Sequence, residues 1–332
     1  MQKILSALAC STALLMAAAA NAQDFNPAVV FDMGGKFDRS FNEGVYNGVE
    51  RFKEETGISY MEFEVTNETQ REQALRRMAR EGADIVLGVG FAQAPAIEEI
   101  AQEYPDTKFA IIDSFVDLPN VQSFVFKDHE GSFLVGMLAA MASETGKVGF
   151  VGGMDVPLIR NFACGYEQGV KYQSPETEII QNMTGTTPAA WNDPGRGAEL
   201  ARSQFDRGVD VVFAAAGGTG IGVYQAAADA GKLAIGVDSN QNFLHPGTML
   251  TSMLKRVDVA AYNAFKSAMD GTWEPGLRDL GVAEDGVGWA LDEHNEALIT
   301  DEMKAAVEDA RQKIINGEIT VVNYNDKNAC EY

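Results

Sequence analysis

The sequence predicts an α/β fold with two doubly wound lobes, each a parallel sheet covered by helices on both faces. Two observations support this prediction. Short apolar runs alternate along the chain with amphipathic segments of helical period, and the same rhythm restarts near residue 147. The chain also has 332 residues, which is enough for two domains of ordinary size.

The N-terminal segment has the pattern of a secretory signal peptide. A lysine precedes the apolar run 4–20, and Ala20-Asn21-Ala22 fits the small-x-small rule for cleavage. We therefore expect residues 1–22 to be removed and the mature chain, starting near Gln23, to be periplasmic. Cys10 lies inside the apolar run rather than at its end, so lipidation at this cysteine is not expected.

The first half is expected to contain four strands and three helices. Val45 and Val49 share one face of the first helix, and Gly57 ends it. Pro95 suits the first turn of the third helix. The strands are expected at 27–31, 60–65, 85–89 and 109–112, and the helices at 41–56, 69–81 and 94–104.

The second half repeats this pattern and then extends it. Residues 249–255 are expected to cross back to the first half, and a helix over 260–269 follows. Thr300 is the expected N-cap of a C-terminal helix over 301–316, with Gly317 after its end. Strands are expected at 147–151, 178–181, 209–213 and 233–237, and helices at 160–171, 195–206 and 220–230.

The two halves join near 123–132 and should enclose a ligand cleft. Lobe I is predicted as 23–124 plus about 254–280, and lobe II as 125–253 plus about 281–332. In open α/β sheets, ligands bind at the carboxyl ends of the strands. The residues that directly follow predicted strands are therefore candidate contacts, namely Asp32, Asp113, Gly217, Gly218 and Asp238.

Composition narrows the class of protein. The chain has 48 Asp and Glu against 26 Lys and Arg, so nucleic acid is not an expected partner. Its hydrophobic content of 46% is enough for full cores, which excludes disorder. Two cysteines remain after cleavage, Cys164 and Cys330, and the sequence leaves open whether they form a disulfide or stay as thiols.

Signals for catalysis are weak, so we expect a binding protein without a metal or cofactor. The three histidines have neither zinc-site nor nucleophile–base spacing. The glycine-rich segment 217–222 has the wrong glycine order for a dinucleotide turn. A secreted nucleoside hydrolase is a less favoured alternative, because the aspartates are spread over strand ends rather than clustered.

Aromatic residues in two loops and one lysine are further candidates for ligand contact. In the loop 32–42, Phe37 and Phe41 either pack against the following helix or stack on a flat heterocycle, whose edge Asn42 would hydrogen-bond. Trp191 offers a second stacking face, or it belongs to a helix-entry motif. Lys255 either donates to a ligand hydroxyl or is a solvated partner of Asp258.

Several ordered motifs resemble one family across nearly all of the mature chain. The opening run Asp-x-Gly-Gly-x-x-Asp-x-Ser-Phe-Asn is similar to the first motif of the basic membrane protein (BMP) family. These are the purine-nucleoside-receptor-like substrate-binding proteins of ABC importers. The matching stretches are 32–42, 130–136, 146–153, 216–220, 235–238 and 252–256.

The resemblance implies a class I periplasmic binding protein, a monomer whose partner is an ABC transporter permease in the inner membrane. Its ligand would be a purine nucleoside, with a free purine, a riboflavin-like heterocycle or a sugar as alternatives. For the base, the implied roles are stacking by Phe41, recognition by Asn42 and Asp113, and a second stacking face from Trp191, with Phe162 and Phe37 as rivals. For the ribose, the implied contacts are Asp238, Lys255 and the backbone of Gly217 and Gly218.

Overall fold

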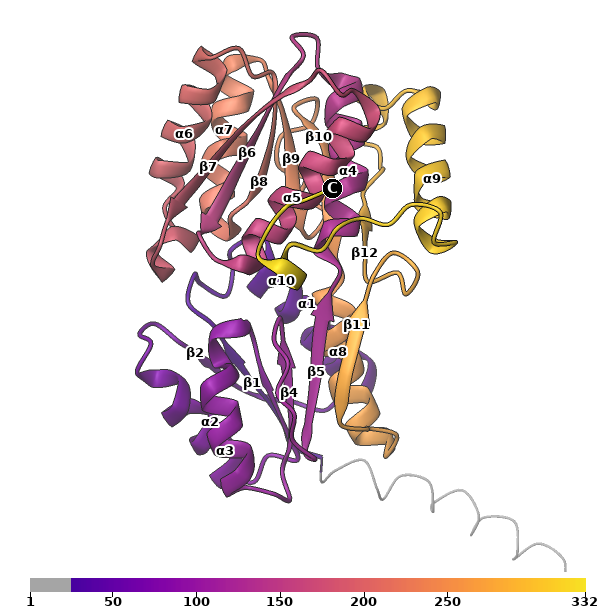
Figure 1. Cartoon of the computed structure of the whole chain (residues 1–332). Helices are drawn as coiled ribbons and strands as arrows, with labels where there is room; N and C mark the ends of the chain where they lie inside the picture. The colour runs from indigo at the N-terminus through magenta and orange to yellow at the C-terminus, as the bar shows by residue number, and fades with distance from the viewer. Residues whose placement is uncertain (1–24) are drawn as a thin grey trace, which may run out of the picture.

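The computed structural model describes residues 25–332 and contains two six-stranded sheets in these residues. Figure 1 shows the two sheets as two lobes, one above the other, each flanked by helices. The predicted α/β class with two doubly wound lobes is confirmed. The predicted signal peptide, its cleavage site and Cys10 all lie outside the described residues.

The first lobe is built around a parallel sheet with strand order β11-β5-β4-β3-β1-β2. Its central strands are buried along their length because helices cover both faces, which explains their continuous apolar runs. The strands are β1 (Pro27–Phe31), β2 (Met61–Glu64), β3 (Ile85–Gly88), β4 (Lys108–Ile112), β5 (Val121–Phe126) and β11 (Gly276–Leu280). The helices are α1 (Phe41–Thr56), α2 (Gln70–Arg80), η1 (Phe91–Gln93), α3 (Ala94–Glu103) and α8 (Val257–Asp270).

The second lobe has strand order β12-β10-β9-β8-β6-β7, with only β12 antiparallel to its neighbour. Its strands are β6 (Lys147–Met154), β7 (Glu178–Gly185), β8 (Val211–Ala215), β9 (Leu233–Asp238), β10 (Met249–Lys255) and β12 (Val287–Trp289). Its helices are α4 (Asp128–Ala142), α5 (Pro157–Gln173), η2 (Pro188–Trp191), α6 (Pro194–Asp206), η3 (Gly217–Thr219), α7 (Gly220–Ala230), η4 (Asn242–Leu244), η5 (Glu296–Leu298), α9 (Asp301–Ile315) and α10 (Tyr324–Lys327).

The structure differs from the sequence prediction in several elements. Strands β5, β11 and β12 were not predicted, and β10 and α4 differ as well. Strand β10 does not cross between the lobes but pairs with β9 and β12 inside the second sheet, and the crossing follows at Arg256. Helix α4 was not predicted, because nearly all of its first three turns are buried and it therefore lacks an apolar stripe. It packs closely on α5, where a Cβ at Gly169 would lie 1.9 Å from the carbonyl oxygen of Phe133.

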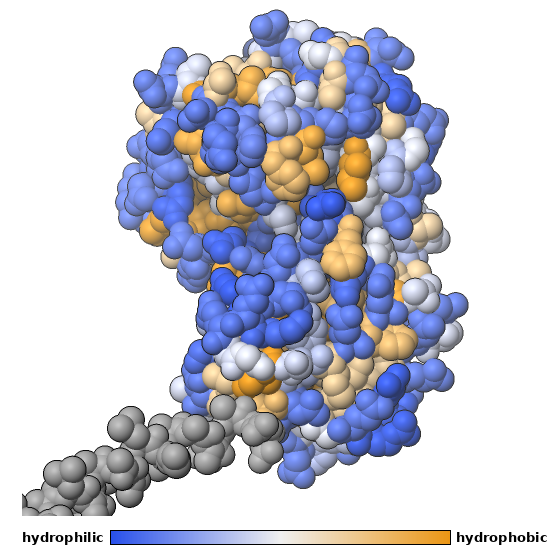
Figure 2. Space-filling model, turned by 180° about the vertical axis from the view of Figure 1, so that it is seen from behind, coloured by the Kyte–Doolittle hydropathy of each residue, from blue (hydrophilic) through white to orange (hydrophobic). Residues whose placement is uncertain are grey.

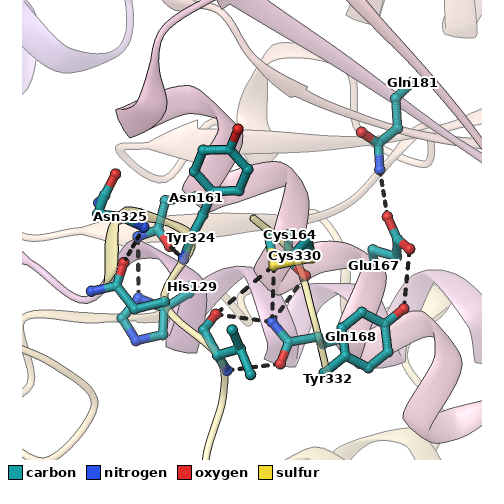
Figure 3. Close-up of a disulfide and its surroundings, with 12 residues drawn as sticks. His129, Asn161, Cys164, Glu167, Gln168, Gln181, Tyr324, Asn325, Cys330 and Tyr332 are labelled. Carbon is teal, nitrogen blue, oxygen red and sulfur yellow. Dashed lines mark hydrogen bonds between the residues drawn. A yellow bond between two sulfur atoms is a disulfide. The ribbon is translucent and has the colours of Figure 1, made fainter. Parts of the chain in front are cut away.

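The C-terminal tail lies along helix α5. Cys164 of α5 forms a disulfide with Cys330, so the alternative of two separate thiols is wrong (Figure 3). Gln168 binds both backbone groups of one tail residue: its Oε1 accepts from the Val322 N–H at 2.8 Å, and its Nε2 donates to the Val322 carbonyl at 3.0 Å. The tail is therefore attached to a helix that also reaches the space between the lobes.

Candidate ligand-binding site

A cavity lies between the lobes and draws its lining from both. Figure 2 shows the molecule indented on one side where the lobes meet, on a surface that is mostly hydrophilic. The first lobe contributes Asp32, Met33, Asp38, Phe41, Asn42, Gly90, Phe91 and Asp113. The second contributes Leu158, Ile159, Phe162, Trp191, Ala215, Ala216, Gly217, Val237, Asp238 and Lys255.

Most of the residues singled out in the sequence meet in this cavity, and two do not. Phe37 is 61% exposed, and its ring packs edge-on against Tyr46 with centroids 5.1 Å apart, so it does not line the cavity. Gly218 is not part of the lining, and a Cβ added to it would lie 3.4 Å from the Trp191 carbonyl oxygen. The nine that line the cavity are Asp32, Phe41, Asn42, Asp113, Phe162, Trp191, Gly217, Asp238 and Lys255.

Two of the cavity aspartates have a left-handed backbone. Asp113 follows β4 with φ of 69°, and Asp238 ends β9 with φ of 65°. Residues other than glycine rarely adopt this conformation, although aspartate tolerates it better than most. Such strained positions cluster at functional sites, where the surrounding structure holds them in place. Both carboxylates thus lie at the cleft-facing ends of parallel strands, where the backbone takes this left-handed turn.

Lys255 is the only lysine or arginine among the residues that line the cavity, and it is fully buried. Its Nζ lies 2.7 Å from Asp113 Oδ1 and 3.2 Å from Asp128 Oδ1. Burial lowers the pKa of Lys255, but the negative charges of Asp113, Asp128 and Asp238 outweigh burial and hold the pKa above its usual value. The side chain is therefore a charged ammonium, and it is neither solvated nor paired with Asp258, which binds Arg256 instead.

The same ammonium lies near aromatic rings. Its Nζ is 5.5 Å from the ring centroid of Phe41 and 5.2 Å from that of Phe162. Both distances fall within the range of a cation–π interaction. The role of Phe41 is therefore not limited to packing against its own helix, because its ring also lies beside the Lys255 ammonium in the cavity.

Two buried acids at the site were not predicted. Asp128 begins α4; burial raises the pKa of its carboxyl group, and the Lys255 ammonium opposes this rise. No pattern in the sequence marks Asp128 as a site residue. It precedes an apolar segment, and nothing in that segment points to a ligand contact. Asp38 lines the cavity, and burial raises its pKa to about 7. Its position just before α1 was a signal for helix capping, and its carboxylate accepts from the N–H groups of Ser40, Asn42 and Glu43 at 2.8, 3.0 and 3.1 Å.

Asn42 and Asp32 differ in how their polar groups are satisfied. The Asn42 side chain donates to Asp38 at 3.3 Å, and its buried Oδ1 has no hydrogen-bond partner among the described residues. A buried acceptor without a partner is costly, so this oxygen is available to a ligand N–H. Asp32 accepts twice from Arg71 at 3.0 Å; burial raises the pKa of Asp32, and Arg71 opposes this rise.

Trp191 combines the two roles considered for its loop. Its side chain lines the cavity, and its ring lies against Gly153, where an added Cβ would be 2.2 Å from the indole. Asp193, two residues later, caps α6 by accepting from the Arg196 N–H at 2.9 Å. The loop thus starts a helix and also presents an aromatic ring to the cleft.

His129 and a cluster of three possible metal ligands lie outside the cavity. His129 is buried next to Asn161, and burial lowers its pKa to about 4. Within residues 25–332, three possible metal ligands come together only at Asp292, Glu293 and His294, which do not line the cavity. None of the helices in the same residues is both long enough and apolar enough to span a membrane.

Two doubly wound lobes with a polar and aromatic cavity between them define the class of two-lobed solute-binding proteins. The chain belongs to the family described as "ABC transporter substrate-binding protein PnrA-like", whose model matches residues 25–325. Membership of this family, which includes proteins named basic membrane proteins, was predicted from the ordered motifs and is confirmed. The family implies a small-molecule ligand and a membrane permease as partner.

Named relatives and solved structures agree with this assignment. The chain is 35% identical to a CD4+ T-cell-stimulating antigen of Listeria monocytogenes, over 91% of this chain and 89% of the relative. It is 31% identical to basic membrane protein D of Borreliella burgdorferi, over 86% and 84% of the two chains. The crystal structure of a solute-binding protein of an ABC transporter system from Aeropyrum pernix superposes with a TM-score of 0.84 at 31% identity, covering 92% and 95%.

Proposed function

We propose that this protein captures a purine nucleoside in the periplasm and delivers it to an ABC importer of the inner membrane. The observation that carries the proposal is the composition of the cavity: aromatic side chains lie among polar groups that come from both lobes. The four aromatic residues of the lining are Phe41, Phe91, Phe162 and Trp191. A nucleoside has the matching division into a flat base and a hydroxylated sugar. Stacking on one ring contributes about 1–3 kcal/mol per base.

The polar groups suit the two parts of such a ligand. Asn42 Oδ1, which has no partner among the described residues, would accept from a base N–H, and Asp113 would accept a second one. Asp238 would accept from ribose hydroxyls, and the Lys255 ammonium would donate to them. Because these groups come from both lobes, a bound ligand would favour the closed form over the open one.

Two features support a periplasmic location for this receptor, which we propose to act as a monomer. The N-terminal sequence has the signal-peptide pattern, and a disulfide joins Cys164 to Cys330, as expected in an oxidising compartment. Relatives from Pyrococcus are named lipoproteins. In this chain the only cysteine of the leader is Cys10, within the apolar run, so we propose a free receptor rather than a lipoprotein.

The proposal is tested by calorimetric titration of refolded mature protein with guanosine, inosine, adenosine, hypoxanthine, riboflavin and galactose. We expect binding of at least one purine nucleoside, and its loss in Phe41→Ala and Asp238→Ala. Binding of hypoxanthine alone would remove the ribose roles of Asp238 and Lys255. Binding of riboflavin or galactose alone, or of none of these compounds, would contradict the proposal.

A further inference from the structure

Hydrogen bonds between the lobes gather at one place beside the cavity. Ser40 Oγ, at the start of α1 in the first lobe, donates to Asp238 Oδ2 in the second at 2.5 Å. Ser239 Oγ donates back across the cleft to the Ser40 carbonyl at 3.1 Å. Gln241 Nε2 donates to the Arg39 carbonyl at 2.7 Å. These residues, Arg39 and Ser40 on one side and 238–241 on the other, are called the interlobe contact below.

The first-lobe side of this contact is held in position by its own helix start. Asp38, rather than Ser40, accepts the N–H groups at the beginning of α1, and the Ser40 hydroxyl makes no capping bond. The Ser40 hydroxyl is therefore available to the other lobe. Ser40 is also fully buried, so its hydrogen bond to the Asp238 carboxylate is shielded from water and correspondingly strong.

The second-lobe side is held by Gln241. Its Oε1 accepts from the Val237 N–H at 2.8 Å and from the Tyr224 hydroxyl at 2.9 Å, both in the same lobe. Gly236 makes room for this amide, since a Cβ there would lie 2.5 Å from Gln241 Oε1. With the oxygen fixed in this way, the amide nitrogen is left to donate to Arg39 of the opposite lobe.

We propose that Ser40 and Gln241 form a latch that stabilises the closed form and so determines how long a ligand stays bound. The inference rests on the proposed function as a ligand-capturing protein, and it adds two positioning residues, neither of which lines the cavity. Asp238 serves both purposes: it lines the cavity and accepts the Ser40 hydroxyl. Ligand contact and lobe closure therefore converge on one carboxylate.

Two substitutions remove bonds of the latch and leave each lobe intact. Ser40→Ala deletes the hydroxyl but leaves the Asp38 cap of α1. Gln241→Glu keeps an acceptor for Val237 and Tyr224, and it replaces the nitrogen that donates to Arg39. Matched controls exist within the second lobe. Among residues 25–332, the hydroxyl of fully buried Ser132 has no hydrogen-bond partner, and buried Gln204 donates only to second-lobe groups. The controls are Ser132→Ala and Gln204→Glu.

Hydrogen–deuterium exchange of the ligand-free mature protein tests the latch without any assumption about the ligand. Ser40→Ala, in the first lobe, should speed exchange of the amides of 236–243 in the second lobe. Gln241→Glu should speed exchange of 38–44 in the first lobe. One hydrogen bond contributes about 0.5–1.5 kcal/mol, so we expect exchange to rise by roughly threefold to tenfold. The two controls should leave exchange across the lobe boundary unchanged.

Stopped-flow measurement of the dissociation of a purine nucleoside that binds in the calorimetric titration, followed by tryptophan fluorescence, is the second test. The latch predicts dissociation faster by roughly threefold to tenfold in either variant, with association little changed. Unchanged exchange across the boundary, or equal effects in the controls, would overturn the latch. If none of the purine nucleosides binds the wild-type protein, the nucleoside proposal fails, and the exchange measurement still decides the latch.

Discussion

At the scale of single residues, the main feature is the ammonium group of Lys255, which lies among several carboxylates. Lys255 lies between Asp113, of the first lobe, and Asp128, just beyond the crossing from β5 to α4. Both carboxylates are almost completely buried. A buried charge without a partner is strongly destabilising, whereas a well-arranged pair is tolerated. Lys255 therefore stabilises the fold as well as the ligand site.

We predict that Lys255→Met destabilises the ligand-free protein by about 3–5 kcal/mol, because two buried carboxylates lose their counter-ion. Urea unfolding measures the change. Lys53→Met is the control, since Lys53 is an exposed lysine paired with Glu50, and its loss should change the free energy of unfolding little. Equal unfolding free energies for the two variants would show that Lys255 has no structural role.

At the scale of elements, helix α5 joins the cavity to the C-terminal tail. Ile159 and Phe162 of this helix line the cavity. Further along the helix, Cys164 holds the tail through the disulfide, and the Gln168 side chain holds it through hydrogen bonds to the tail backbone (Figure 3). The disulfide spans a sequence separation of 166 residues. Cross-links that close long loops restrict the unfolded chain most, so this one should contribute strongly to stability.

We predict that the double variant Cys164→Ser with Cys330→Ser unfolds more easily by about 2–4 kcal/mol. The tail after α9 should also become sensitive to limited proteolysis, because only a few hydrogen bonds would then hold it. Reducing agent should reproduce both effects in the wild-type protein and leave the double variant unchanged. A double variant as stable as the wild type would mean that the disulfide is structurally neutral.

At the scale of the whole molecule, charge and lobe arrangement restrict the ligand. The chain has a formal net charge of −22, and the cavity between its lobes is lined by four aspartates against one lysine. Such an electrostatic field disfavours anions both on approach and once they are bound. A neutral solute is therefore the better match to this cavity.

We predict that guanosine monophosphate binds at least about tenfold more weakly than guanosine, a difference of about 1.4 kcal/mol. The phosphate would meet the carboxylates of Asp32, Asp38 and Asp238, while Lys255 is already engaged by two acids. Competitive titration at constant ionic strength measures the ratio. Equal affinities would indicate that the 5′ end of the ligand points away from these carboxylates.

The sequence by itself determined the alternation of strands and helices and the positions of the strand ends, because both depend on local periodicity and on chain-turning residues. It thereby identified Asp113, Asp238, Phe41 and Asn42, which lie at or directly after such boundaries. Local pattern is sufficient there, since parallel strands bring their carboxyl ends to the same edge of a sheet. The ordered motifs likewise identified the family.

Only the tertiary structure decided which side chains meet. Asp128 joins Lys255, Phe37 turns away to Tyr46, and strand β10 stays in the second sheet. The disulfide and the interlobe hydrogen bonds connect residues more than 150 positions apart. The physical reason is the same in each case. Contacts between distant segments depend on how whole faces of helices and sheets pack together, and the local sequence pattern does not specify which face a segment will pack against.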